Sequence, residues 1–143
     1  RFSTMKLAVL ISMLIASSYC GMSSWIRVGG TLTCTELFHY RVTLWEQDWA
    51  DTHDLVASLK TLPSDGTTAK FDIEGKAEDG LGEWWVEPAV TIEHSCGKIR
   101  GCVCKKWETD YEKPNPKYFE IDLNKDEEYC DLCDVVLERR GEP

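Results

Sequence analysis

Six cysteines are the residues of this sequence whose type and spacing could do chemistry. The chain of 143 residues has seven cysteines, of which Cys20 lies in an N-terminal segment considered below; the others are Cys34, Cys96, Cys102, Cys104, Cys130 and Cys133. An even number of cysteines in an oxidising compartment normally forms a disulfide framework, whereas in a cytosolic protein the same residues would indicate metal or redox chemistry. Six cysteines allow fifteen pairings, so the count alone leaves the connectivity open.

The four late cysteines allow two interpretations. Cys102 and Cys104 are two residues apart on an expected strand, so both project to one face. Cys130 and Cys133 could meet them there from the C-terminal tail, and two disulfides would then fasten the tail to the domain. Alternatively, Cys-x-Cys together with Cys-x-x-Cys supplies four soft ligands for a zinc ion. A redox-active Cys-x-x-Cys is disfavoured, because the two neighbouring aspartates raise rather than lower a thiol pKa.

Other patterns typical of catalysis or metal binding are weak. His39, His53 and His94 lie in three different segments without metal-ligand spacing. His94 lies on an alternating strand and is interpreted as a packed structural imidazole. No nucleophile elbow, His-Glu-x-x-His or phosphate-loop motif occurs. None of these patterns indicates catalysis or a histidine metal site, and no cofactor is expected.

One acidic stretch resembles the opening of a calcium loop. Asp122, Asn124 and Asp126 place oxygen atoms at alternate positions. Glu127 stands where the turn glycine of such a loop should be, and Cys133 stands where its closing glutamate should be. The stretch is therefore interpreted as a solvated acidic face.

Tryptophan is unusually frequent. The following are too many for one small core to bury completely: Trp45, Trp49, Trp84, Trp85 and Trp107. Trp84 and Trp85 follow the loop 78–82, and adjacent residues of an extended segment point to opposite faces, so at least one is expected to be exposed. Exposed aromatic side chains are favoured anchors in binding interfaces. Trp84 and Trp85 are therefore the candidate binding residues.

The charge of the chain is acidic. It has 16 Lys and Arg against 25 Asp and Glu, for a net charge of −9. A nucleic-acid partner would require a basic face, and the acidic charge disfavours such a face, so no nucleic-acid partner is expected. The same charge repels anionic lipid headgroups, so direct binding to a membrane lipid would require a bridging calcium ion or a local basic patch such as Arg100, Lys105 and Lys106. An extracellular or cell-surface protein is the favoured partner, and a membrane lipid is the alternative.

The first twenty residues have the pattern of a secretory signal peptide. Met5 and Lys6 precede the apolar run 7–15, which is followed by small residues. This run is half of the roughly 20 residues that a transmembrane span requires, so no membrane anchor is expected. Cleavage after Cys20, or alternatively after Ser18, would release a secreted chain. Residues 1–20 are thus upstream sequence plus signal peptide, and 21–143 form one domain.

The elements that must position these residues are mainly short strands. Alternation of apolar and polar residues, bounded by turn signals, predicts seven of them: 25–34, 41–46, 55–61, 71–75, 89–96, 101–107 and 119–123. This spacing favours an all-β, two-sheet sandwich. Only 126–140 has a helix-like composition, and a single helical turn or an irregular tail fits it as well as a full helix does.

Several motifs occur in the order found in a known family. They include VGGTLTC at 28–34, VTLWEQD at 42–48, FDIEG at 71–75, IEHSC at 92–96 and YFEIDL at 118–123. The set resembles the transthyretin-like proteins, a large family of secreted nematode proteins, over roughly residues 25–123. Residues 124–143 form an acidic tail with two further cysteines. The tail, and the absence of Asn and Pro from 35–41, depart from the family pattern.

The resemblance implies a transthyretin-type, disulfide-stapled β-sandwich, an extracellular location, no catalytic activity and a bond between Cys34 and Cys96. Family members act as secreted adaptors or signals that bind lipids or proteins at cell surfaces. We therefore expect a secreted, non-enzymatic binding or signalling module. A zinc protein that uses the four late cysteines is the first alternative. A hydroxyisourate-hydrolase-like enzyme is the second, although the chain has Arg-Arg-Gly-Glu-Pro at 139–143 in place of that enzyme's Tyr-Arg-Gly-Ser.

Overall fold

The structure is a computed structural model that describes residues 23–47, 53–78, 86–98, 100–109, 116–126 and 128–138. The expected signal peptide, Trp49, Trp84 and Trp85 lie outside these ranges. The described residues form eight strands and one helix: β1 (Ser23–Thr33), β2 (His39–Glu46), β3 (Asp54–Ser58), β4 (Leu62–Pro63), β5 (Thr68–Glu78), β6 (Pro88–His94), β7 (Gly101–Lys106), β8 (Lys117–Asp122) and α2 (Asp131–Glu138). None of the described residues forms a helix with the length and apolar character needed to cross a membrane.

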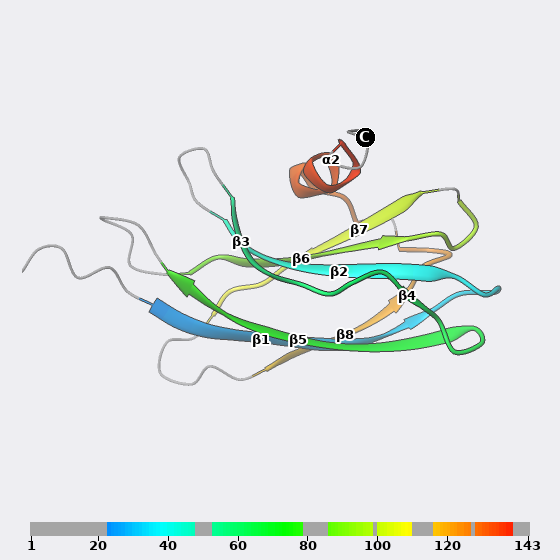
Figure 1. The fold of residues 1–143 in the computed structure, drawn as a ribbon, viewed down its shortest axis with the longest axis horizontal. Coiled ribbons are helices and arrows are strands. Elements are labelled where there is room, and N and C mark those ends of the chain that lie inside the picture. Colours follow the sequence, from blue (N-terminus) through cyan, green and yellow to red (C-terminus); the bar gives the residue numbers. More distant parts are fainter. Residues whose placement is uncertain are drawn as a thin grey trace, which may run out of the picture.

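The strands form two sheets that lie face to face (Figure 1). The first sheet has the order β5-β1-β8, in which β1 pairs antiparallel with β5 and parallel with β8. The second sheet has the order β3-β2-β6-β7, and the two-residue strand β4 also pairs with β2. The helix α2 lies against the outer face of the second sheet (Figure 1). The predicted two-sheet, mainly β architecture is therefore confirmed, and the tail, for which a helix and an irregular segment were both open, contains an eight-residue helix.

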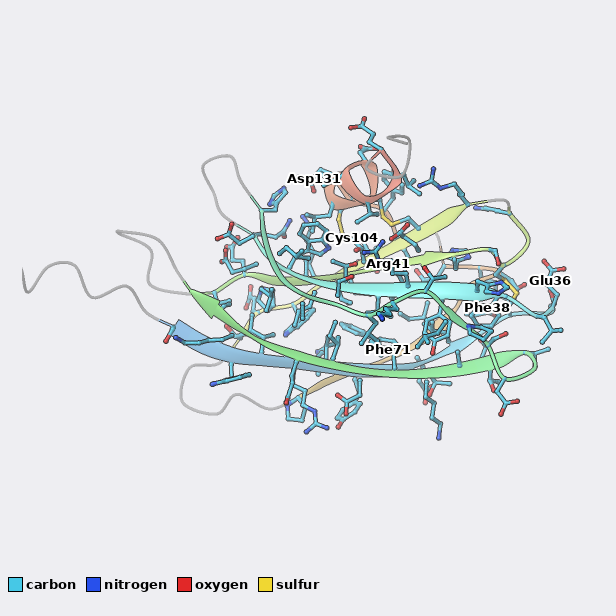
Figure 2. All side chains as sticks on the ribbon, in the orientation of Figure 1. Glu36, Phe38, Arg41, Phe71, Cys104 and Asp131 are labelled. Carbon is cyan, nitrogen blue, oxygen red and sulfur yellow. A yellow bond between two sulfur atoms is a disulfide. The ribbon has the colours of Figure 1, made fainter. Side chains whose placement is uncertain are left out.

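The core between the sheets follows from the period-two pattern of the strands. The first sheet contributes alternate residues of β1 and β5 to the core, such as Val28 and Ile73. The second sheet contributes Val42, Ile92 and Val103. Phe71 points from the first sheet into this space (Figure 2). The outward residues of β1 and β5 are exposed, so the first sheet has one buried face and one solvated face.

The second sheet is buried on both faces over part of its width. Trp45 and Cys104 point away from the sandwich core into a smaller apolar cluster with Leu132, Cys133 and Val136 of α2. Every residue of β6 is consequently buried, including the polar Thr91 and Glu93. The helix does not reach across β2 and β3, and this leaves part of the outer face uncovered.

Some predicted boundaries were wrong. The predicted strand 55–61 ends at Ser58, because β3 pairs with only Thr43–Glu46 and its register shifts between Leu44 and Trp45. The last hydrogen bond from this segment to β2 is the one that Leu59 N donates to Val42 O, at 2.9 Å. After Leu59 the chain leaves this strand pairing and then forms the short β4. The predicted strand 71–75 extends over 68–78, because β5 pairs with the whole length of β1.

Candidate functional site

The six cysteines form three disulfides: Cys34–Cys96, Cys102–Cys133 and Cys104–Cys130. The first is the pairing that the family resemblance implies, and it joins the end of β1 to the residues after β6, so it crosses between the sheets. The other two fasten α2 and the segment before it to β7 (Figure 2).

These bonds decide between the two interpretations of the late cysteines. Zinc binds thiolates, and all four of these sulfur atoms are in disulfides. Within the described ranges, no group of three or more His, Cys, Asp or Glu side chains is arranged to hold a metal ion. The zinc alternative and the redox-active Cys-x-x-Cys therefore do not describe this structure.

A shallow groove runs along the outer face of the second sheet beside α2. It consists of two adjoining hollows of about 250 and 80 Å³ that share Arg41 and Glu93. The larger hollow is further lined by Thr43, Trp45, Leu55, Ser58 and Val136. We call this site the outer groove. It exists because the two disulfides place α2 over β6 and β7, so that Arg41 of β2 and Leu55 and Ser58 of β3 stay accessible beside the helix.

Arg41 is the charged group at the centre of the outer groove. Its Nε donates to Ser58 Oγ at 3.3 Å and lies 3.9 Å from Glu93 Oε1. Glu93, on β6, is the antiparallel pairing partner of Arg41. Ser58 Oγ also lies 3.2 Å from Thr43 Oγ1. The Arg41 side chain is 38% exposed, and its two terminal nitrogens make no hydrogen bond to the described residues. They remain able to bind a carboxylate.

Three apolar side chains, Trp45, Leu55 and Val136, line the larger hollow beside Arg41, together with the polar Thr43, Ser58 and Glu93. Trp45 is buried, with its Nε1 donating to Thr91 Oγ1 at 2.9 Å. Leu55 is 54% exposed, and Val136 faces the groove from α2. The groove therefore offers a guanidinium whose Nε faces Glu93 and whose terminal nitrogens lie beside apolar side chains, which suits an acidic side chain next to an aliphatic one.

Asp131 ties the start of α2 to β7 and to the residue before β3. His53 Nε2 lies 3.0 Å from Asp131 Oδ2, at the start of α2, and Lys106 Nζ lies 3.8 Å from Asp131 Oδ1. The hydrogen bond with His53 and the charge of Lys106 hold the pKa of Asp131 below its usual value. These contacts add to the disulfides that fix the position of α2 relative to β3.

The basic residues proposed for lipid binding are occupied within the molecule. Arg100 Nη2 donates to Leu137 O at 2.8 Å, and Lys105 Nζ donates to Asp126 Oδ1 at 3.0 Å and also to Glu128. Together with the Lys106–Asp131 contact, these bonds pair each of the three basic side chains with a group of the same molecule. Direct lipid binding stays a prediction.

The other predicted residues have mostly structural roles. His94 is buried, its Nδ1 accepts a hydrogen bond from Cys96 N at 3.2 Å, and burial lowers its pKa, with a smaller contribution from Lys98. Asn124 donates to Asp122 Oδ1 at 2.8 Å, so the acidic stretch forms a local turn. Trp84 and Trp85 lie outside the described ranges and stay a prediction.

Two exposed aromatic residues were missed by sequence reasoning. Trp25 is 65% exposed and Tyr118 is 64% exposed, both on the outer face of the first sheet. The alternation of β1 placed Trp25 opposite to the buried Ile26 and Val28 and was the signal that could have identified it.

Comparison of the chain with models of protein families and with characterised proteins found no match.

Proposed function

We propose that this protein is a secreted, non-enzymatic binding module of the transthyretin-like type that recognises an extracellular or cell-surface protein through the outer groove. The signal-peptide pattern and three disulfides support an oxidising extracellular location. The ordered motifs and the bridge between the sheets at Cys34 support the transthyretin-type fold.

The observation that carries the proposal is the composition of the outer groove. Its hollows, about 250 and 80 Å³, are smaller than the roughly 300 to 1,000 Å³ of a typical small-molecule site. They fit one or two side chains of a partner protein. Arg41 presents free N–H groups beside Leu55 and Val136, so the favoured partner segment carries an Asp or Glu next to an aliphatic residue.

Selection from a random peptide library tests this proposal with the secreted, disulfide-bonded protein as bait. We expect enriched peptides to share an acidic residue adjacent to an aliphatic one. Loss of a hydrogen bond to a charged group costs about 1.5 to 3 kcal/mol, so Arg41→Ala should weaken binding by about 10- to 100-fold. Isothermal titration calorimetry with a selected peptide measures this change.

A matched variant separates the groove from general charge effects. Lys125→Ala removes the same charge from a side chain that is 83% exposed and lies outside the groove, and it should leave the affinity unchanged. Equal binding by the Arg41→Ala variant, or a consensus without an acidic residue, would contradict recognition through the outer groove.

A further inference from the structure

The outer face of the first sheet carries a second set of side chains, on the opposite side of the sandwich from the outer groove. Trp25, Arg27 and Gly29 alternate outward along β1, and Tyr118 of β8 is the ladder partner of Gly29. Cross-strand partners project to the same face, so Trp25 and Tyr118 share it. We call this surface the aromatic face.

The two rings of the aromatic face are well separated. Trp25 and Gly29 are four residues apart, which corresponds to about 13 Å along a strand. Each ring is almost two-thirds exposed. They therefore form two separate platforms and not one continuous apolar patch of the kind that buries against an apolar protein surface.

Gly29 determines how Tyr118 lies. A Cβ at position 29 would stand 2.9 Å from Tyr118 Cε1 and 3.1 Å from Cδ1. The tyrosine ring thus occupies the space that a side chain at this position would fill, and lies down across β1. This arrangement leaves the opposite side of the ring to solvent.

Arg27 and Asp72 place a fixed polar pair between the platforms. Arg27 Nε donates to Asp72 Oδ1 at 2.9 Å, and Arg27 Nη2 donates to Asp72 Oδ2, so the pair is bidentate. Both side chains are 49% exposed. The guanidinium retains N–H groups and the carboxylate retains lone pairs, so the pair can bind adjacent hydroxyl groups as both donor and acceptor.

The charges on this face balance. Among outward residues of the β1 register whose side chains are described, three are cations and four are anions: Arg27, Lys70, Lys76, Asp72, Glu74, Glu120 and Asp122. The fourth anion, Asp122, is paired with Lys125, whose Nζ lies 3.0 Å from Asp122 Oδ2. In a chain of net charge −9, this local neutrality disfavours a polyanion or a polycation as ligand. A neutral ligand with hydroxyl groups and apolar C–H faces complements the surface.

We propose that the aromatic face binds an extended neutral oligosaccharide, with Trp25 and Tyr118 stacking on two sugar rings and the Arg27–Asp72 pair hydrogen-bonding to hydroxyls between them. Sugar rings present C–H groups on their faces, which contact aromatic rings by dispersion. Their vicinal hydroxyls match a bidentate pair. This site is separate from the outer groove and does not depend on the function proposed there.

Titration of the secreted, disulfide-bonded protein with defined hexasaccharides tests the proposal. The probes are cellohexaose, chitohexaose and maltohexaose, with a sulfated heparin hexasaccharide as the anionic comparison. We expect at least one neutral probe to bind with a change in tryptophan fluorescence that is insensitive to added salt. Trp25→Ala and Tyr118→Ala should each lower the affinity about tenfold, and Tyr118→Phe should retain it.

Two variants make the test specific. Tyr129→Ala removes a tyrosine that is 53% exposed beside α2 and should bind like the wild type. Gly29→Ala keeps both aromatic rings but displaces Tyr118, so it should weaken binding without changing the circular dichroism spectrum. The proposal is overturned if none of the neutral probes binds, if Trp25→Ala binds as the wild type does, or if sedimentation shows that this face instead joins two copies of the chain.

Discussion

Gly29 and Gly30 are neighbours in β1, yet a side chain at each would meet different surroundings. A Cβ at Gly30 would stand 2.4 Å from Phe119 O and 2.8 Å from Phe71 Cε1. The first is a backbone atom of the paired strand and the second belongs to a buried ring. At Gly29 the two nearest atoms belong to the exposed ring of Tyr118, which can rotate away, and the only backbone atom among the three nearest is Phe71 O at 3.2 Å.

Gly30→Ala should therefore destabilise the protein much more than Gly29→Ala. Overpacking of this kind costs about 1 to 3 kcal/mol, and we expect Gly30→Ala near the upper end and Gly29→Ala near the lower end. Urea unfolding monitored by circular dichroism measures both changes. Equal losses of stability would show that the backbone of β8 yields as easily as an exposed side chain.

The sequence predicted the role of a residue where that role depends on its own strand, and not where it depends on distant elements. The sequence predicted that His94 is a packed imidazole, because alternation along one strand is sufficient for that inference. Arg41 was not singled out, because its importance depends on the gap between α2 and the neighbouring strand β3. No spacing along the chain indicates that gap.

At the scale of elements, α2 is held mainly by covalent bonds and a few apolar side chains. It has eight residues, which is too short for an isolated helix to be stable in water. Leu132, Cys133 and Val136 are buried against the second sheet, and two nested disulfides anchor the segment. Because the helix depends on these disulfides and contacts, composition alone could not decide between a helix and an irregular segment for the tail.

Removing the two tail disulfides should have a non-additive effect. The bridges close 31 and 26 residues, but while one is intact the other closes only a short additional loop. Loop-closure entropy then gives a cost of about 2 kcal/mol for the first bridge removed and about 3.5 kcal/mol for the second.

Serine pairs at the bonded positions provide this measurement. Denaturant unfolding of Cys102→Ser/Cys133→Ser, of Cys104→Ser/Cys130→Ser and of the fourfold variant gives the three free energies. Equal increments for the two bridges would indicate that they act independently, in conflict with the nested arrangement.

The strands were predictable because one face of each is buried and the other is exposed. That pattern weakens in the second sheet, where α2 also covers the outer face and β6 is buried throughout. The polar Thr91 and Glu93 kept the alternation visible in the sequence although both are buried. The short β4 has no such pattern and was missed, since its two residues depend on pairing with His39 and Tyr40.

At the scale of the whole molecule, the outer groove and the aromatic face lie on opposite sides of the sandwich. The two sheets between them share one core, which is packed from both inner faces. The two proposals thus assign a partner protein to one side of the sandwich and a carbohydrate to the other.

The two ligands should bind independently. Sites on opposite faces without shared side chains are expected to show little coupling. With the selected acidic peptide at saturation, the dissociation constant for the bound hexasaccharide should change by less than about twofold. Calorimetric titration with and without the peptide measures this ratio, and strong competition would mean that both ligands use one surface.

The central position of β1 in the first sheet also determines when the fold can form. This strand comes first among those described, but one of its neighbours, β8, lies near the other end of the described chain, and their pairing joins residues such as Leu32 and Ile121. Contacts so distant in sequence slow folding and leave strand edges open meanwhile. During synthesis Cys34 emerges 62 residues before Cys96, so its thiol must wait for the correct partner. Correct folding should thus depend on exchange of any premature disulfide of Cys34 until Cys96 and β8 have been synthesised.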